Sequence, residues 1–169
     1  MTNKQRVRRL TAAALSAALC YVATTFLRVP TALGYINLGD AFVLLSGGLF
    51  GPLYGGLAAG IGSGLSDLFG YPQYAPVTLL IKCAMAAIAA VFFRLSDKRP
   101  PLTANLFRLL GAVLAEVVMI GGYLAYESVL YGFGAAVVSV PFNALQGAAG
   151  IVLAMVLYPL IYKPLKKRL

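Results

Sequence analysis

The chain has 169 residues, of which 60% are hydrophobic and 11% are charged, and its net charge is +9. A soluble domain usually carries about 25% charged residues, so this composition, with a mean hydropathy of +0.84, excludes an ordinary soluble protein and indicates a membrane protein. The positive charge alone would also suit a nucleic-acid-binding protein. The basic residues, however, stand almost entirely in clusters beside apolar runs, which disfavours nucleic acid as a partner.

Taken in chain order, the apolar runs predict six helices. They cover residues 7–27, 38–50, 52–69, 77–95, 106–130 and 135–162. Pro52 suits the first turn of the third helix, because its missing N–H is not needed there. The second and third helices are shorter than the roughly 20 residues of a full span, so we expect them to tilt or to stop partway. The prediction is an all-α integral membrane protein, with residues 1–169 forming one compact bundle and a single domain.

The basic clusters predict how this bundle is oriented. Six passes return the chain to its starting side, so both termini and the connection at 96–105 share one side of the membrane. Lysine and arginine are enriched on the cytoplasmic side of membrane proteins. The three clusters are Lys4, Arg6, Arg8 and Arg9; Arg94, Lys98, Arg99 and Arg108; and Lys163, Lys166, Lys167 and Arg168. Both termini are therefore predicted to be cytoplasmic.

Lys82 interrupts the apolar run of the fourth helix. A lysine at the centre of a membrane helix costs about 2.5–3.5 kcal/mol on insertion scales, and such residues usually face the bundle interior. Glu116 lies at similar depth in the fifth helix, so the two are predicted to pair. Two interpretations stay open: the pair faces a ligand pocket, or it only supports the walls. A purely structural pair is less favoured, because a buried ion pair seldom repays its desolvation.

Other polar residues lie inside the predicted helices or at their ends. Asp67 lies near the outer end of the third helix, and the spacing of Ser139, Asn143 and Gln146 places them on one face of the sixth. Such groups either mark a ligand path or only join helices by hydrogen bonds, and both interpretations stay open. Asp40, at the start of the second helix, is explained by N-terminal capping at least as well as by ligand contact.

Tyrosines gather near the predicted outer ends of the helices. They are Tyr35, Tyr71, Tyr74, Tyr123, Tyr126 and Tyr131. An aromatic belt at the membrane interface accounts for most of them. Tyr35, Tyr71 and Tyr74 lie on loops beside the polar residues, so ring contact with a ligand is an equal alternative for one or two of these.

No motif predicts catalysis or a resident cofactor. The sequence lacks the G-x-x-x-x-G-K-[ST] loop that holds ATP and the G-x-S-x-G turn of a serine nucleophile. It has no histidine and no cysteine cluster, which argues against a transition-metal site. We therefore expect no enzyme, no metal and no cofactor.

Two stretches carry a resemblance to a known family. They are GYINLGDAFVLLSGGLFGP, from Gly34, and GGLAAGIGSGLSDLFGYPQYAPVTLLIK, which ends at Lys82. In these motifs, and over most of its length, the chain resembles the substrate-binding S components of energy-coupling factor (ECF) vitamin transporters. It is most similar to the branch labelled riboflavin-type, which also covers hydroxymethylpyrimidine and vitamin B6-like substrates.

The resemblance implies a multi-pass protein of a prokaryotic plasma membrane with six helices and cytoplasmic termini. It implies a pocket near the outer face, built from the first outward loop and the last three helices. The residues expected to bind substrate are Tyr35, Asn37, Asp67, Tyr71, Tyr74, Lys82, Glu116, Tyr123, Asn143 and Gln146.

The same resemblance implies partners. They are a small vitamin ligand, one transmembrane coupling subunit and two cytoplasmic ATPases, and the bound S component topples in the membrane to carry the ligand inward. An A-x-x-x-A motif on the first helix meets the coupling subunit in this family. It is matched, in two overlapping registers, by Ala13, Ala14, Ala17 and Ala18.

The ligand is predicted only as a class. The absence of tryptophan and the many polar groups favour a pyridine or pyrimidine vitamin precursor over riboflavin, which would need a larger aromatic site. Two alternatives stay open. One is an autonomous transporter that moves its ligand with protons through Asp67 or Glu116. The other is an integral membrane enzyme, which no motif supports.

Overall fold

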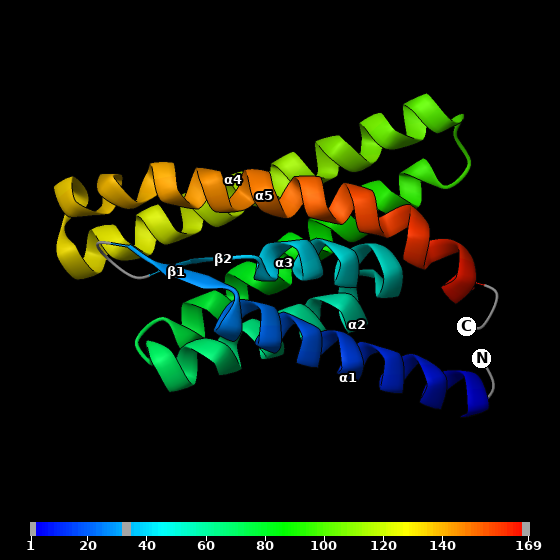
Figure 1. Cartoon of the computed structure of the whole chain (residues 1–169), viewed down its shortest axis with the longest axis horizontal. Helices are drawn as coiled ribbons and strands as arrows, with labels where there is room; N and C mark the ends of the chain where they lie inside the picture. Colours follow the sequence, from blue (N-terminus) through cyan, green and yellow to red (C-terminus); the bar gives the residue numbers. More distant parts are fainter. Residues whose placement is uncertain (1–2, 32–34, 167–169) are drawn as a thin grey trace.

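The computed structural model describes residues 3–31 and 35–166, the side chain of residue 166 excepted. The elements are α1 (Asn3–Phe26), β1 (Arg28–Pro30), β2 (Tyr35–Asn37), α2 (Gly39–Gly70), α3 (Ala75–Ser96), α4 (Pro101–Tyr131) and α5 (Phe133–Lys166). The helices lie along one another in a single bundle (Figure 1). Among the described residues, five helices are long and apolar enough to cross a membrane. This confirms the prediction of an all-helical membrane bundle.

The helix count differs from the prediction, because the second and third expected helices form one element, α2. Its backbone leaves the helical conformation at Gly51, where φ is 85° and ψ is −179°. Glycine reaches this region without a steric penalty, and Pro52 directly after it needs no N–H partner at a helix start. The chain therefore reverses without a loop. The two arms of α2, 39–50 and 52–70, run in opposite directions (Figure 1).

Small residues let the arms and their neighbours approach closely. A side chain at Gly55 would collide with the backbone of Ser46 and Gly47 on the first arm, and one at Gly62 would collide with the backbone of Ala17 in α1. Small residues at such crossings replace side-chain packing by direct backbone contact. As a result α2 is the most enclosed of the five helices, with 56% of its apolar window buried, and it forms the centre of the bundle.

A short hairpin joins α1 to α2. β1 pairs with β2 in antiparallel register, with Val29 opposite Ile36. The sequence predicts this segment only as a loop. The two strands were not predicted, because three residues each are too few to give a clear strand pattern. Gly34, the first residue of the family-like stretch, lies outside the described residues.

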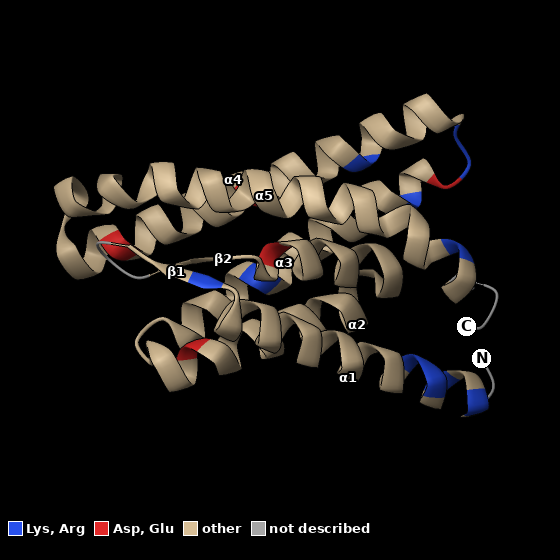
Figure 2. Ribbon diagram, viewed as in Figure 1, with Lys and Arg blue, Asp and Glu red and all other residues tan. Residues whose placement is uncertain are grey.

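The two ends of the bundle differ in charge. The start of α1, the α3–α4 connection and the end of α5 lie at the same end (Figure 1), and Figure 2 shows that lysine and arginine gather there. We call this the basic end. β1, which contains Arg28, lies away from it (Figure 1), and Lys82 in α3 is buried inside the bundle. Lys167 and Arg168 of the third predicted cluster lie outside the described residues.

Candidate functional site

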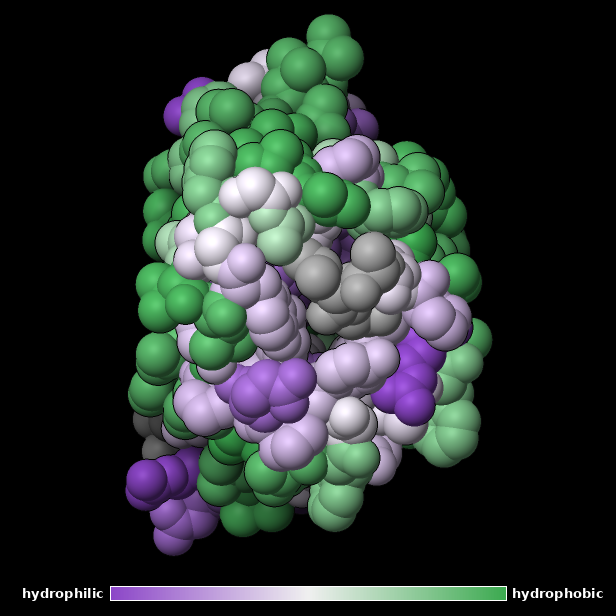
Figure 3. All heavy atoms as spheres, turned by 90° about the vertical axis from the view of Figure 1, so that its left-hand side faces the viewer, coloured by the Kyte–Doolittle hydropathy of each residue, from purple (hydrophilic) through white to green (hydrophobic). Residues whose placement is uncertain are grey.

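A cavity opens at the end of the bundle opposite the basic end, beneath the hairpin. The enclosed volume of the cavity is about 50 Å³. Its walls are Thr24, Thr31, Tyr35, Asn37, Asp67, Tyr71, Tyr74, Thr78, Lys82, Tyr123, Glu127, Asn143 and Gln146. Figure 3 shows polar residues around a hollow on this face, with apolar residues on the flanks that would meet lipid.

All of the residues predicted to bind substrate line this cavity except Glu116. They come from β2, α3, α4, α5, the far end of α2 and the turn that follows it. The structure thus brings together residues that are more than 100 positions apart in the chain. Ligand contact by these residues remains a prediction, but their convergence on one cavity is a fact of the fold.

The buried lysine has a different partner from the one predicted. Lys82 donates to Asp40 Oδ1 in an ion pair in which both side chains are almost completely buried. The carboxylate oxygens of Glu116 are buried and have no hydrogen-bond partner among the described residues. The expected Lys82–Glu116 pair is therefore wrong. Depth along the helices alone could not tell which carboxylate pairs with Lys82. Because α2 lies at the centre of the bundle, it brings Asp40 to the lysine.

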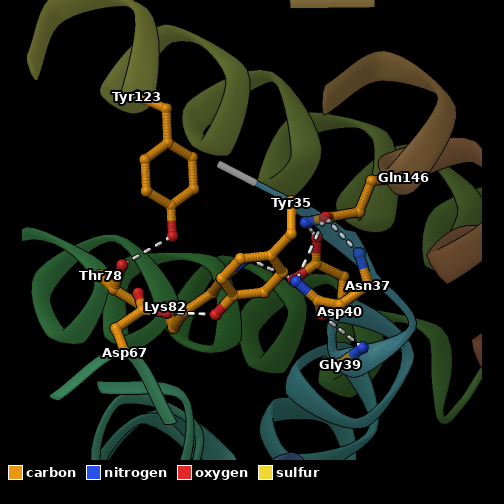
Figure 4. A network of polar contacts seen from close by, with 9 residues as sticks. All are labelled: Tyr35, Asn37, Gly39, Asp40, Asp67, Thr78, Lys82, Tyr123 and Gln146. Carbon is orange, nitrogen blue, oxygen red and sulfur yellow. Dashed lines mark hydrogen bonds and ion pairs between the residues drawn. The ribbon is translucent and has the colours of Figure 1, made fainter. Parts of the chain in front are cut away.

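Asp40 also serves no capping role. The N-cap position of α2 is Leu38, whose side chain makes no capping hydrogen bond. Instead Asp40 Oδ2 accepts a hydrogen bond of 2.6 Å from the Gln146 amide. Because Asp40 holds Lys82 on one oxygen and Gln146 on the other, it links α2, α3 and α5 below the cavity (Figure 4).

Gln146 continues this network to the hairpin. Its Oε1 accepts from the Asn37 backbone N–H at 2.8 Å and from the Asn37 side-chain amide at 3.2 Å. Asn37 Oδ1 in turn accepts from the Gly39 N–H at 2.7 Å. A side chain at Gly39 would collide with the side chains of Thr24 and Asn37. The glycine is therefore required for β2 and α2 to meet at this point.

Tyrosines and carboxylates line the part of the cavity that lies away from Asp40. Tyr35 donates to Asp67, and the hydroxyls of Tyr123 and Thr78 are 2.9 Å apart (Figure 4). Burial and the neighbouring Asp67 carboxylate raise the pKa of the Tyr35 hydroxyl above its usual value, so Tyr35 remains a neutral donor. On the other side Tyr74 donates to Glu127 at 3.3 Å.

Ring contacts connect these groups into a continuous lining. The ring centroids lie 5.3 Å apart for Tyr35 and Tyr71, 6.4 Å for Tyr71 and Tyr74, and 6.3 Å for Tyr74 and Tyr123. Lys82 Nζ lies 5.6 Å from the Tyr123 centroid, within cation–π range. These four tyrosines turn toward the cavity, so the interfacial-belt interpretation does not describe them.

Four wall residues were missing from the sequence-based site. They are Thr24, Thr31, Thr78 and Glu127. Glu127 could have been found, because it is one of only five acidic residues and lies near the C-terminal end of its helix. The threonines carry no such signal, since threonine is common in membrane helices for packing reasons.

The alanine face of α1 lies apart from the cavity. Ala14 and Ala18 are exposed, whereas Ala13 is buried inside the bundle. Of the two overlapping A-x-x-x-A registers, that of Ala14 and Ala18 is the exposed one, whereas Ala13 is buried; contact of these alanines with a coupling subunit stays a prediction. Ala14 and Ala18, together with Ala17, line an apolar hollow between α1 and α2.

Comparison with known proteins identifies the family. Residues 4–164 match the family model described as ECF-type riboflavin transporter, S component. A protein of Pyrococcus woesei, described as an uncharacterized protein in gap 3'region, is 41% identical over 126 residues, which are 74% of this chain and 80% of that protein. The thiamine precursor transporter HmpT of Lactococcus lactis subsp. cremoris, strain MG1363, is 28% identical over 165 residues, which are 95% of this chain and 91% of that protein. No significant match was found among solved structures. Because the family model spans nearly the whole chain, this multi-pass membrane protein belongs to the family of S components of ECF-type riboflavin transporters.

Proposed function

We propose that this chain is the substrate-binding subunit of an ECF-type importer and captures a small water-soluble vitamin or precursor at the outer face. A pyridoxine- or hydroxymethylpyrimidine-like compound is the favoured ligand, and riboflavin is next. The observation that carries the proposal is the buried polar cavity lined by tyrosine rings. Ligand pockets combine apolar or aromatic walls with a few placed polar groups, and this cavity has both.

The chemistry of the walls favours a single small ring. Hydroxyl, amide and carboxylate groups surround the cavity on all described sides, so most ligand surface would meet hydrogen-bonding groups. The sequence has no tryptophan to form a broad aromatic sandwich. The similarity to HmpT, whose name states a thiamine precursor as its cargo, supports a pyrimidine among the candidates.

The orientation that we propose places the basic end in the cytoplasm and the cavity on the outer side. The chain would then cross the membrane six times, with the two arms of α2 as the second and third passes. Enrichment of lysine and arginine on the cytoplasmic side supports this orientation, since the described basic clusters all lie at one end (Figure 2). Reporter fusions at each connection would test it.

Energy for uptake comes, in this proposal, from a transmembrane coupling subunit with two cytoplasmic ATPases. The sequence has no phosphate-binding loop of its own. The exposed Ala14 and Ala18 on α1 offer a smooth helix face, on which a partner helix can approach closely. This is the surface that we assign to the coupling subunit.

Mass spectrometry of the small molecule that co-purifies with the chain tests the ligand directly. We expect a pyrimidine or pyridine compound, and calorimetry on the emptied protein should show that it binds. Recovery of a flavin would shift the assignment to riboflavin. An emptied, folded protein that binds no compound of these three classes would overturn the proposal.

One observation favours a second function, an autonomous proton-coupled transporter. Glu116 is buried, 3% exposed, and without a hydrogen-bond partner in the described part of the chain. An ionisable group of this kind inside the membrane often marks a proton path. Uptake in cells that lack every ATPase partner, abolished by Glu116→Gln, would establish this alternative and refute the importer.

A further inference from the structure

The cavity walls carry more negative than positive charge. Asp67 and Glu127 line the cavity, and Lys82 is the only basic side chain on its described walls. Lys82 is already paired with Asp40, so its charge is compensated within the protein. Arg28 is exposed and lies over the Tyr35 ring, outside the walls. The cavity is therefore suited to a ligand that brings donors or positive charge.

Neither wall carboxylate forms an ion pair with a lysine or arginine in the described part of the chain. Asp67 accepts from the Tyr35 hydroxyl, and Glu127 accepts from the hydroxyls of Tyr74 and Ser139. All of these donors are neutral. An ionised carboxylate offers about four lone-pair sites, so each retains capacity for a further donor. Both side chains are about 95% buried. A further donor, from water or from a ligand, can therefore reach them only from the cavity.

The two carboxylates have different surroundings. Arg28 lies over the ring of Tyr35, and Tyr35 donates to Asp67. No lysine or arginine forms an ion pair with Glu127 among the described residues, so Glu127 has no cationic partner there. It lies at the end of the row of rings formed by Tyr71 and Tyr74, where a flat ligand stacked on the tyrosines would reach it.

One further wall group has no partner. Thr24 Oγ1 is buried and makes no hydrogen bond among the described residues. A buried polar group without a partner is costly, and this group lines the cavity. It indicates that the lining is completed by a bound molecule.

We infer that the site selects a flat heteroaromatic ligand that carries a hydrogen-bond-donating amino group, with Glu127 as its acceptor, and rejects anionic or phosphorylated forms. The inference rests on the proposed function and narrows it to one ligand chemistry. An amino group donates to a carboxylate, whereas a carbonyl in the same place turns its lone pairs toward it. A phosphate ester would bring further negative charge beside the uncompensated carboxylates, a juxtaposition that costs several kcal/mol in protein interfaces. Tyrosine faces add attraction for a ring that carries positive charge.

Calorimetry with three probes on the purified, emptied chain tests the inference. The probes are an aminopyrimidine bearing a hydroxymethyl group, its analogue with a carbonyl in place of the amino group, and the phosphate ester of the first. We expect the carbonyl analogue to bind at least roughly 100-fold more weakly, because a site built for a donor rejects an analogue that lacks it. The phosphate ester should not bind measurably.

The outcomes separate this inference from the proposed function. Equal binding of the amino and carbonyl probes, or binding of the phosphate ester, would overturn the inference and leave the vitamin-binding function standing. Failure of all three probes, together with pyridine compounds and riboflavin, would remove the proposed function and this inference with it.

A variant tests the role of Glu127. Glu127→Gln keeps an acceptor for Tyr74 but removes the charge and adds an N–H donor. We expect the aminopyrimidine to bind about tenfold more weakly or worse, and the preference over the carbonyl analogue to shrink. Asp97→Asn is the matched control, because it removes one negative charge from the exposed α3–α4 connection and should leave both affinities unchanged. An unaltered preference in folded Glu127→Gln would overturn the assignment. If that variant does not fold, the three probes on the unmodified chain still decide the inference.

Discussion

Removal of the buried lysine is the most informative single perturbation of this protein. In Lys82→Met the hydrophobic volume is largely kept, but Asp40 loses its only ion-pair partner among the described residues. Asp40 is completely buried and Lys82 is 2% exposed. Breaking a buried pair by removing one partner typically costs about 3–5 kcal/mol. We expect a loss of this size in the free energy of unfolding, reduced to the extent that Gln146 still donates to Asp40.

The choice of second substitution separates the two candidate partners. Lys82→Met combined with Asp40→Asn removes both charges, and the new amide still accepts from Gln146, so most of the lost stability should return. Lys82→Met combined with Glu116→Gln leaves Asp40 uncompensated and should not recover. Thermal unfolding of the detergent-purified variants, followed by circular dichroism, measures both. Recovery with Glu116→Gln but not with Asp40→Asn would refute the pairing described here.

Ligand binding in the stable double variant then decides whether the pair touches the ligand. If Lys82 and Asp40 only hold the walls, calorimetry should give the affinity of the unmodified chain. If Lys82 contacts the ligand, the variant should be stable and bind poorly. Lys82 lines the cavity, so we expect the second result. Full affinity would remove Lys82 from the binding site.

Three further substitutions follow from the fold. Gly39→Ala places a methyl group against the side chains of Thr24 and Asn37. Overpacking of this kind should cost about 1–3 kcal/mol of folding stability, measured as a lower melting temperature and weaker ligand binding. An unchanged melting temperature would contradict the close approach of β2 and α2. Gly51→Ala forces a residue with a side chain to φ 85°. This should lower the free energy of unfolding by about 1–3 kcal/mol and leave the ligand affinity of the folded protein unchanged. Unchanged stability would argue against the reversal of the chain at Gly51. Ala14→Trp and Ala18→Trp should abolish co-purification with the coupling subunit while the ligand still binds. Ala13→Trp should instead unfold the bundle, because Ala13 is buried. Complexes formed at full yield by the first two variants would refute the assignment of this face of α1 to the coupling subunit.

The helices could be predicted from the sequence, because apolar runs of membrane length are a strong local signal. The sequence predicts a helix break at Gly51 and Pro52. It does not show whether this Gly-Pro pair starts a loop or reverses the chain within two residues, as it does in the structure. The tyrosines could be placed near one end of the helices by their positions, and the spacing of Asn143 and Gln146 places them on one helix face. The partner of Lys82 could not, because Asp40 and Glu116 are both carboxylates within reach, and only the central position of α2 separates them.

The short first arm of α2 sets the distance that a captured molecule must still travel. Residues 39–50 make a helix about 18 Å long at 1.5 Å per residue, against a hydrocarbon thickness of about 30 Å. With Gly51 near the inner boundary, as our orientation has it, the arm begins roughly 12 Å beneath the outer boundary. The paired hairpin occupies the space above, where non-helical backbone is tolerated because it lines a cavity. In the proposed orientation, a molecule that contacts Gln146 in the cavity would therefore lie roughly 12 Å beneath the outer boundary before any step driven by ATP.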